Sequence, residues 1–172
     1  MRKHLMTVAL LLATGSAIAQ MPYAGMYLRP VKALSEQQVA DLNAGRGMGL
    51  AFAGELNGYP GPSHVIELAD QLALRPDQRD KIKGLFESMK AEAVPLGSKL
   101  IAQETELDKL FASRSITPAS LKASTAAIAV TQGELREIHL KYHLFAADIL
   151  SSDQIKKYAE LRGYTAGDVH HH

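Results

Sequence analysis

The feature that most constrains the fold of this chain is a pair of long segments in which apolar residues recur at helical spacing. In the first, about residues 76–112, the apolar stripe is formed by Ile82, Leu85, Met89, Leu96, Leu100, Leu107 and Phe111. In the second, about residues 117–149, it is formed by Leu121, Ile128, Leu135, Ile138, Tyr142, Phe145 and Ile149. Such a stripe buries one face of an α-helix. Because only a short polar break at residues 113–115 separates the segments, we expect an antiparallel hairpin.

Shorter helical segments flank this hairpin. Residues 34–57 are expected to begin as a helix, which the three glycines between positions 45 and 49 weaken by about 1 kcal/mol each. Short helices are also expected at about residues 63–72 and 152–161. No segment shows the period of two that is typical of a strand. The predicted fold is therefore all-α, a hooked antiparallel helical hairpin of about four helices, preceded by a signal peptide.

The N-terminus has the pattern of a secretory signal peptide. Arg2 and Lys3 provide a positive start, residues 5–13 form a short apolar run, and Ala17-Ile18-Ala19 is a small-residue cleavage site. We expect residues 1–19 to be the signal peptide, with cleavage after Ala19 and a periplasmic location for the mature protein. An uncleaved signal that serves as an N-terminal anchor is the alternative.

The remaining 153 residues are divided into three regions. Residues 20–33 are expected to be a flexible arm, residues 34–164 a single helical domain, and residues 165–172 a disordered tail. The tail ends in three histidines, which could be native or part of a purification tag. No segment approaches the ~20 apolar residues of a transmembrane helix. No membrane span is therefore expected after signal cleavage.

Charge and cysteine content narrow the possible partners. The mature chain has 17 basic and 18 acidic residues, whereas a nucleic-acid-binding protein normally presents a basic surface. The chain has no cysteine, which excludes disulfides and a lipid-anchored lipoprotein. A metal site in this protein must therefore use histidine, carboxylate or methionine ligands.

One design is repeated at four expected helix starts. An aliphatic residue precedes the helix, a hydroxyl residue can cap it, an acid or proline occupies the first turn, and glutamine can reach back to the cap. The four segments are Leu34-Ser35-Glu36-Gln37-Gln38, Leu74-Arg75-Pro76-Asp77-Gln78, Ile116-Thr117-Pro118-Ala119-Ser120 and Leu150-Ser151-Ser152-Asp153-Gln154. Arg75 departs from the pattern because arginine cannot accept a hydrogen bond as a cap.

These segments resemble the LTxxQ motif of the periplasmic Spy/CpxP proteins and their relatives among heavy-metal sensors and resistance proteins, CnrX and ZraP. The resemblance covers roughly residues 34–164, including the closing sequence at residues 158–164. It implies a four-helix hooked hairpin that is often a homodimer. For function it implies either metal sensing and resistance, read by a signalling partner, or ATP-independent chaperone action on unfolded clients during envelope stress.

The histidines are the candidate ligands for a metal. His139 and His143 are four residues apart, which places both imidazoles on one helix face about 6 Å apart, within reach of one ion. Leu140 stands where a zinc protease has its glutamate base, so this is ligand geometry without a general base. His64 and Glu67 share a face of the preceding short helix. These four residues are the predicted site for a divalent transition metal, either Zn, Ni, Co or Cu.

The hairpin register suggests a further carboxylate. With the apex near Ser115, His139 faces about residue 91, which makes Glu87 and Glu92 the candidates. In the sensors that the chain resembles, an early-helix histidine, a hairpin glutamate and a late-helix pair converge on one ion. His64 and the pair at His139 and His143 fit that pattern, although the late pair there includes a methionine.

Two functions therefore compete. The first is a periplasmic metal-binding sensor or resistance protein, and the second is a chaperone in which the histidines are incidental. The methionines are too scattered along the sequence for a copper-binding methionine cluster, and Met89 is expected in the core. An enzyme is not expected, because the sequence has no cysteine nucleophile, no phosphate-binding loop after a strand, and no serine–histidine–acid arrangement.

Overall fold

The computed structural model describes residue 23 and residues 25–164, and the predicted signal peptide and His-containing tail lie outside these residues. The regular elements of the described part are all helices, with no strand among them, which confirms the all-α prediction. The elements are η1 (Met26–Leu28), α1 (Glu36–Asn43), α2 (Phe52–Glu55), α3 (Pro62–Glu67), α4 (Pro76–Ala112), α5 (Pro118–Ile149) and α6 (Ser152–Arg162). None of the described helices is long and apolar enough to cross a bilayer.

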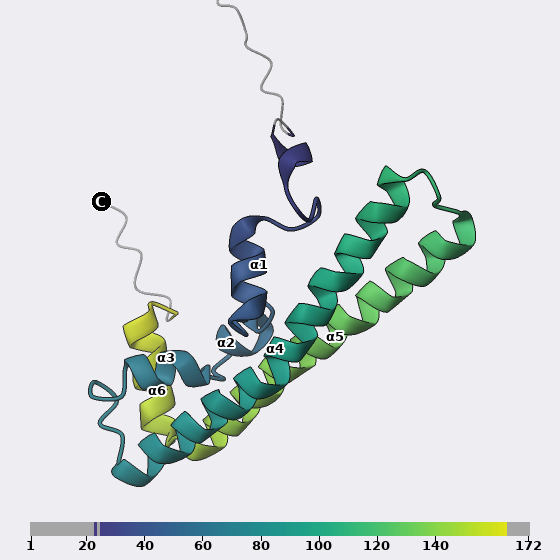
Figure 1. Cartoon of the computed structure of the whole chain (residues 1–172). Helices are drawn as coiled ribbons and strands as arrows, with labels where there is room; N and C mark the ends of the chain where they lie inside the picture. Colours follow the sequence, from purple (N-terminus) through teal and green to yellow (C-terminus); the bar gives the residue numbers. More distant parts are fainter. Residues whose placement is uncertain (1–22, 24, 165–172) are drawn as a thin grey trace, which may run out of the picture.

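Helices α4 and α5 form the predicted antiparallel hairpin and lie side by side along most of their length (Figure 1). Polar side chains also connect the two helices. Lys99 Nζ lies 3.4 Å from Glu134 Oε2, and the Glu92 carboxylate accepts hydrogen bonds from Lys141 Nζ at 2.6 Å and Tyr142 Oη at 2.7 Å. The apolar stripes meet in one core, formed by Met89, Ala93, Leu100, Ile128, Leu135, Ile138 and Tyr142 together with Leu42 of α1.

The repeated motif does form helix caps. The hydroxyl groups of Ser35, Thr117 and Ser151 each accept a hydrogen bond from the backbone N–H three residues later, at 3.1–3.2 Å. At the start of α4 only the return bond is present, from the Arg75 N–H to Gln78 Oε1 at 3.1 Å. This difference follows from the guanidinium, which has no acceptor atom.

Two motif glutamines also meet in the interior. Gln78 Nε2 donates to the Ile149 carbonyl at 2.8 Å and to Gln154 Oε1 at 2.9 Å. Gln154 Nε2 approaches Gln78 Oε1 at 3.1 Å and the Leu72 carbonyl at 3.3 Å. The start of α4 is thereby joined to the start of α6 at the end of α5.

The short helices cover one side and one end of the hairpin. Helix α1 crosses α4 so closely that a Cβ atom at Gly97 would collide with the Leu42 carbonyl. Helix α2 packs on α5, and α3 packs on both hairpin helices. Helices α3 and α6 gather at the end where α4 begins and α5 ends (Figure 1). A second core fills that end, formed by Val65, Ala69, Leu72, Leu74, Ile82, Ala146, Leu150 and Tyr158.

The segment before α1 also contacts the hairpin. Val31 is buried, and the Lys32 N–H donates to Asp108 Oδ2 at 2.8 Å. This part of the predicted arm therefore lies against the C-terminal half of α4, near the hairpin loop.

Candidate metal centre

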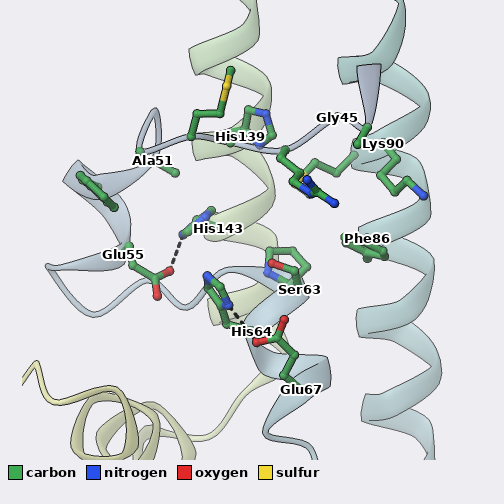
Figure 2. Close-up of a pocket in the computed structure, with 18 residues that line it drawn as sticks. Gly45, Ala51, Glu55, Ser63, His64, Glu67, Phe86, Lys90, His139 and His143 are labelled. Atoms are coloured by element: carbon green, nitrogen blue, oxygen red, sulfur yellow. Dashed lines mark hydrogen bonds and ion pairs between the residues drawn. The ribbon is translucent and has the colours of Figure 1, made fainter. Parts of the chain in front are cut away.

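A cavity of about 520 Å³ lies between the short helices and the hairpin. Its wall includes the segment from Ala44 to Gly49, the end of α2, the start of α3, and facing positions of α4 and α5. Figure 2 shows His139, His143 and His64 one below another in the middle of the cavity, with Glu55 on one side and Phe86 and Lys90 on the other. All four predicted ligands, the three histidines and Glu67, therefore line a single space.

His139 is the deepest of the three imidazoles. It is only 2% exposed, and its buried Nε2 has no hydrogen-bond partner among the described residues. Burial, reinforced by the nearby His143, lowers the pKa of His139 to about 4. The ring is therefore neutral at pH 7. Gly47 leaves room for it, since a Cβ atom at that position would lie 3.2 Å from His139 Nδ1.

His143 lies one helical turn further along α5 and is held in one tautomer. Its Nδ1 lies 2.7 Å from the Tyr59 carbonyl, which can only accept, so Nδ1 carries the proton. In the neutral ring, Nε2 is then the nitrogen with the lone pair. Gly61 packs against this edge of the ring, where a Cβ atom would come within 2.9 Å of Nε2. An imidazole with one nitrogen bonded to a backbone carbonyl and the other free is a common arrangement for metal ligands.

His64 reaches the cavity from α3. Its Nδ1 lies 3.1 Å from Glu67 Oε2, as the spacing of three residues predicts. Both side chains are accessible, His64 at 37% and Glu67 at 63% exposure. Glu67 can therefore orient the imidazole, and the His64 side chain has space to turn toward α5.

Glu55 is the carboxylate that sequence reasoning missed. Its side chain is 5% exposed, and its Oε2 lies 3.5 Å from His143 Nδ1. It follows the glycine-rich segment, where no helical period indicates that it is buried. Its only sequence signal is a charged residue at the end of a short apolar stretch, Leu50 to Gly54.

The α4 wall differs from the expectation drawn from the register. Phe86, Met89 and Lys90 line the cavity there, whereas Glu87 is exposed and does not line it. Glu92 is occupied by Lys141 and Tyr142, which hold the pKa of its carboxyl below the ordinary value through hydrogen bonds. Met89 lies in the core as predicted, and Met48 also lines the cavity. The fold thus brings two methionines that are distant in sequence to one space.

The donor atoms suit a transition metal, but they are not drawn together on one point. Among the described residues, no three histidine, aspartate or glutamate side chains converge closely enough to hold an ion. A neutral imidazole is nonetheless the form that binds a metal, and His139 is held in it by burial. An ion held by these residues would require the side chains, His64 above all, to move inward.

Comparisons with protein-family models, curated proteins and solved structures give no match to this chain. The similarity to LTxxQ proteins therefore depends on the motif residues themselves. The cavity and the side chains around it are the basis on which a function can be assigned.

Proposed function

We propose that this protein is a periplasmic metal-binding sensor or heavy-metal resistance protein. In this proposal His64, His139 and His143 bind a divalent transition metal ion in the cavity, and Glu67 supports His64. The observation that carries the proposal is the position of three imidazoles from two helices around one cavity, with His139 held neutral by burial. Zn, Ni, Co and Cu all accept neutral imidazole ligands.

The setting of the site agrees with such a role. The predicted signal peptide directs the chain to the periplasm, and the helix-start motifs resemble those of hooked-hairpin metal sensors. Because the ligands lie on α3 and α5, a shared ion would change how the short helix sits on the hairpin. A change of that kind can be read by a signalling partner or across a homodimer.

Isothermal titration calorimetry of the full chain tests this proposal. All proteins should carry alanine at residues 170–172, because the terminal histidines can bind metal independently. We expect Zn, Ni, Co or Cu to bind with Kd below about 1 μM. His139→Ala with His143→Ala should abolish binding, and His64→Ala should weaken it by about tenfold or more. Unchanged affinity in the double variant would refute the assignment.

A specific feature also favours a second candidate function, an ATP-independent chaperone of the Spy/CpxP type. Helix α2 and the residue that follows it present Phe52 and Leu56, which are 61% and 54% exposed, and α2 packs on α5 beside Leu140. Leu144, one turn further along α5, is 51% exposed. An exposed apolar surface of this kind is typical of protein-binding sites.

The chaperone function is tested by suppression of client aggregation without ATP. Activity should persist in the presence of a chelator and should fall when Phe52, Leu56 and Leu144 are replaced together by serine. Val130→Ser is the matched control. Val130 is 58% exposed but lies in the half of α5 that is nearer the hairpin loop, away from Leu140 and Leu144. Equal activity of the triple variant and the control would exclude this surface.

A further inference from the structure

Glu55 is the centre of a buried hydrogen-bond cluster that extends well beyond the cavity. Its Oε1 accepts hydrogen bonds from the Tyr158 hydroxyl and, at 3.1 Å, from the Tyr164 hydroxyl. Arg162 Nε lies 3.9 Å from the same oxygen. A buried carboxylate is costly unless hydrogen bonds and a counter-charge compensate it, and the three groups around Oε1 all come from the C-terminal part of the fold.

The local structure of α6 explains how these groups reach Glu55. Gly163 adopts φ 71°, which reverses the chain after the helix, and the Tyr164 N–H donates back to the Ala159 carbonyl at 2.8 Å. This Schellman-type ending turns Tyr164 toward the interior. Tyr158 is 2% exposed, and burial and its bond to Glu55 raise the pKa of its hydroxyl, so it remains a protonated donor.

The other oxygen of Glu55 belongs to the cavity. Its Oε2 accepts a hydrogen bond from the Gly61 N–H at 3.0 Å and lies 3.5 Å from His143 Nδ1. Gly61 caps the N-terminus of α3, the helix that carries His64. One carboxylate therefore contacts both ligand-bearing helices through one oxygen and α6 through the other.

We propose that Glu55 couples occupancy of the cavity to the packing of α6. This inference rests on the proposed metal-binding function. A cation near His143 attracts the Glu55 carboxylate. A shift of His64 toward α5 moves the start of α3 and displaces the Gly61 N–H that donates to Oε2. The same movement takes Oε1 away from Tyr158 and Tyr164. Occupancy thus loosens the C-terminal half of α6, which becomes the surface that a partner reads.

The coupling is tested first without metal. Gly61→Ala places a Cβ atom 2.9 Å from the His143 ring and 3.2 Å from Glu55 Oε2, so it displaces both groups. Hydrogen exchange of residues 152–164 should rise by about tenfold, because bonds to a buried charged group are lost. Gly47→Ala is the matched control, since it crowds His139 at 3.2 Å and no atom of Glu55 is among its near neighbours. Equal exchange in the two variants overturns the coupling.

The second test adds Zn to the full chain with alanine at residues 170–172. In the wild type, Zn should raise exchange of residues 152–164 by about tenfold. In Glu55→Gln, which keeps one acceptor oxygen and the size of the side chain but loses the charge, Zn should still bind while exchange of α6 no longer responds. If this variant does not fold, Tyr164→Phe should reduce the response, because it removes only one hydroxyl of the cluster.

The outcomes separate the two ideas. Calorimetric binding of Zn with no change in α6 overturns the coupling and leaves the metal-binding function intact. Absence of Zn, Ni, Co and Cu binding overturns both. Binding with an α6 response that persists in Glu55→Gln overturns the role of Glu55 as the connecting residue.

Discussion

Protonation of a single residue, His139, should limit the stability of this protein in acid. The ring is buried and its Nε2 has no partner in the part of the chain that the structure describes, so the folded state disfavours the imidazolium. Its pKa is about 4 in the folded protein and 6.5 in an unfolded chain. Between these values the unfolded chain binds more protons, and lowering the pH therefore favours unfolding.

We predict that the free energy of unfolding falls by up to about 3 kcal/mol between pH 6.5 and pH 4 through this residue. His139→Leu should remove most of that dependence, as measured by urea denaturation at several pH values. His64→Leu, at an accessible position, is the control for the general effect of replacing a histidine with leucine. A wild-type slope in His139→Leu would show that other groups cause the acid sensitivity.

Gly97 is a second residue whose identity is set by one contact. A Cβ atom there would meet the carbonyl of Leu42, which belongs to the backbone of α1 and cannot turn aside. We predict that Gly97→Ala destabilises the fold by about 1–3 kcal/mol despite the better helix propensity of alanine. Gly133→Ala, which has open space around its Cβ, should stabilise it by up to about 1 kcal/mol. Thermal denaturation of both variants tests the contrast.

Among the elements, α4 and α6 depend on each other through the paired glutamines. Gln78→Leu or Gln154→Leu removes the hydrogen bonds between the two amides and deprives the Ile149 or the Leu72 carbonyl of its glutamine donor, at a cost of about 1–3 kcal/mol. We expect the double variant to cost less than the sum of the single variants, with a coupling of at least about 0.5 kcal/mol in urea denaturation. Gln38→Leu is the matched control. It removes the same cap bond at an exposed position, so a loss as large as that of Gln78→Leu would contradict an interior role.

The elements also differ in how well sequence pattern predicted them. Helices α4 and α5 were predicted within about a residue at each end, because caps, proline positions and apolar period all act locally. The segment at residues 34–57, which was expected to begin as a helix and to weaken at its glycines, forms α1 and α2 with the glycine-rich segment between them. In that segment Gly45, Met48 and Gly49 have positive φ, and the sequence contains no regular period that would reveal this path.

For the molecule as a whole, metal binding should be visible as added stability, because an ion that binds only the folded state shifts the unfolding equilibrium. At a free Zn concentration of 100 Kd the gain is about 2.7 kcal/mol, which corresponds to a rise in Tm of roughly 5–10 °C. The double variant His139→Ala/His143→Ala, with residues 170–172 also changed to alanine, should show no rise. A similar shift in that variant would place the ion elsewhere.

Part of the cavity could be anticipated from spacing. His139 and His143 share a helix face by their separation of four, and His64 and Glu67 pair at a separation of three, so these local relations were predictable. The position of α4 opposite them was predicted only to within about a turn. Because of that error, Glu87 and Glu92 were expected to face the histidines, whereas in the structure Phe86, Met89 and Lys90 line the cavity on the α4 side.

The amino-acid order was enough to establish helices, caps and the long hairpin, because those features depend on interactions within a few residues and on the burial of one apolar face. It was not enough to place Glu55 among Gly61, His143, Tyr158 and Tyr164, or to join Gln78 to Gln154. These groups are separated by up to 109 residues along the chain. Their meeting depends on how the short helices dock on the hairpin, and no periodicity in the sequence records that geometry.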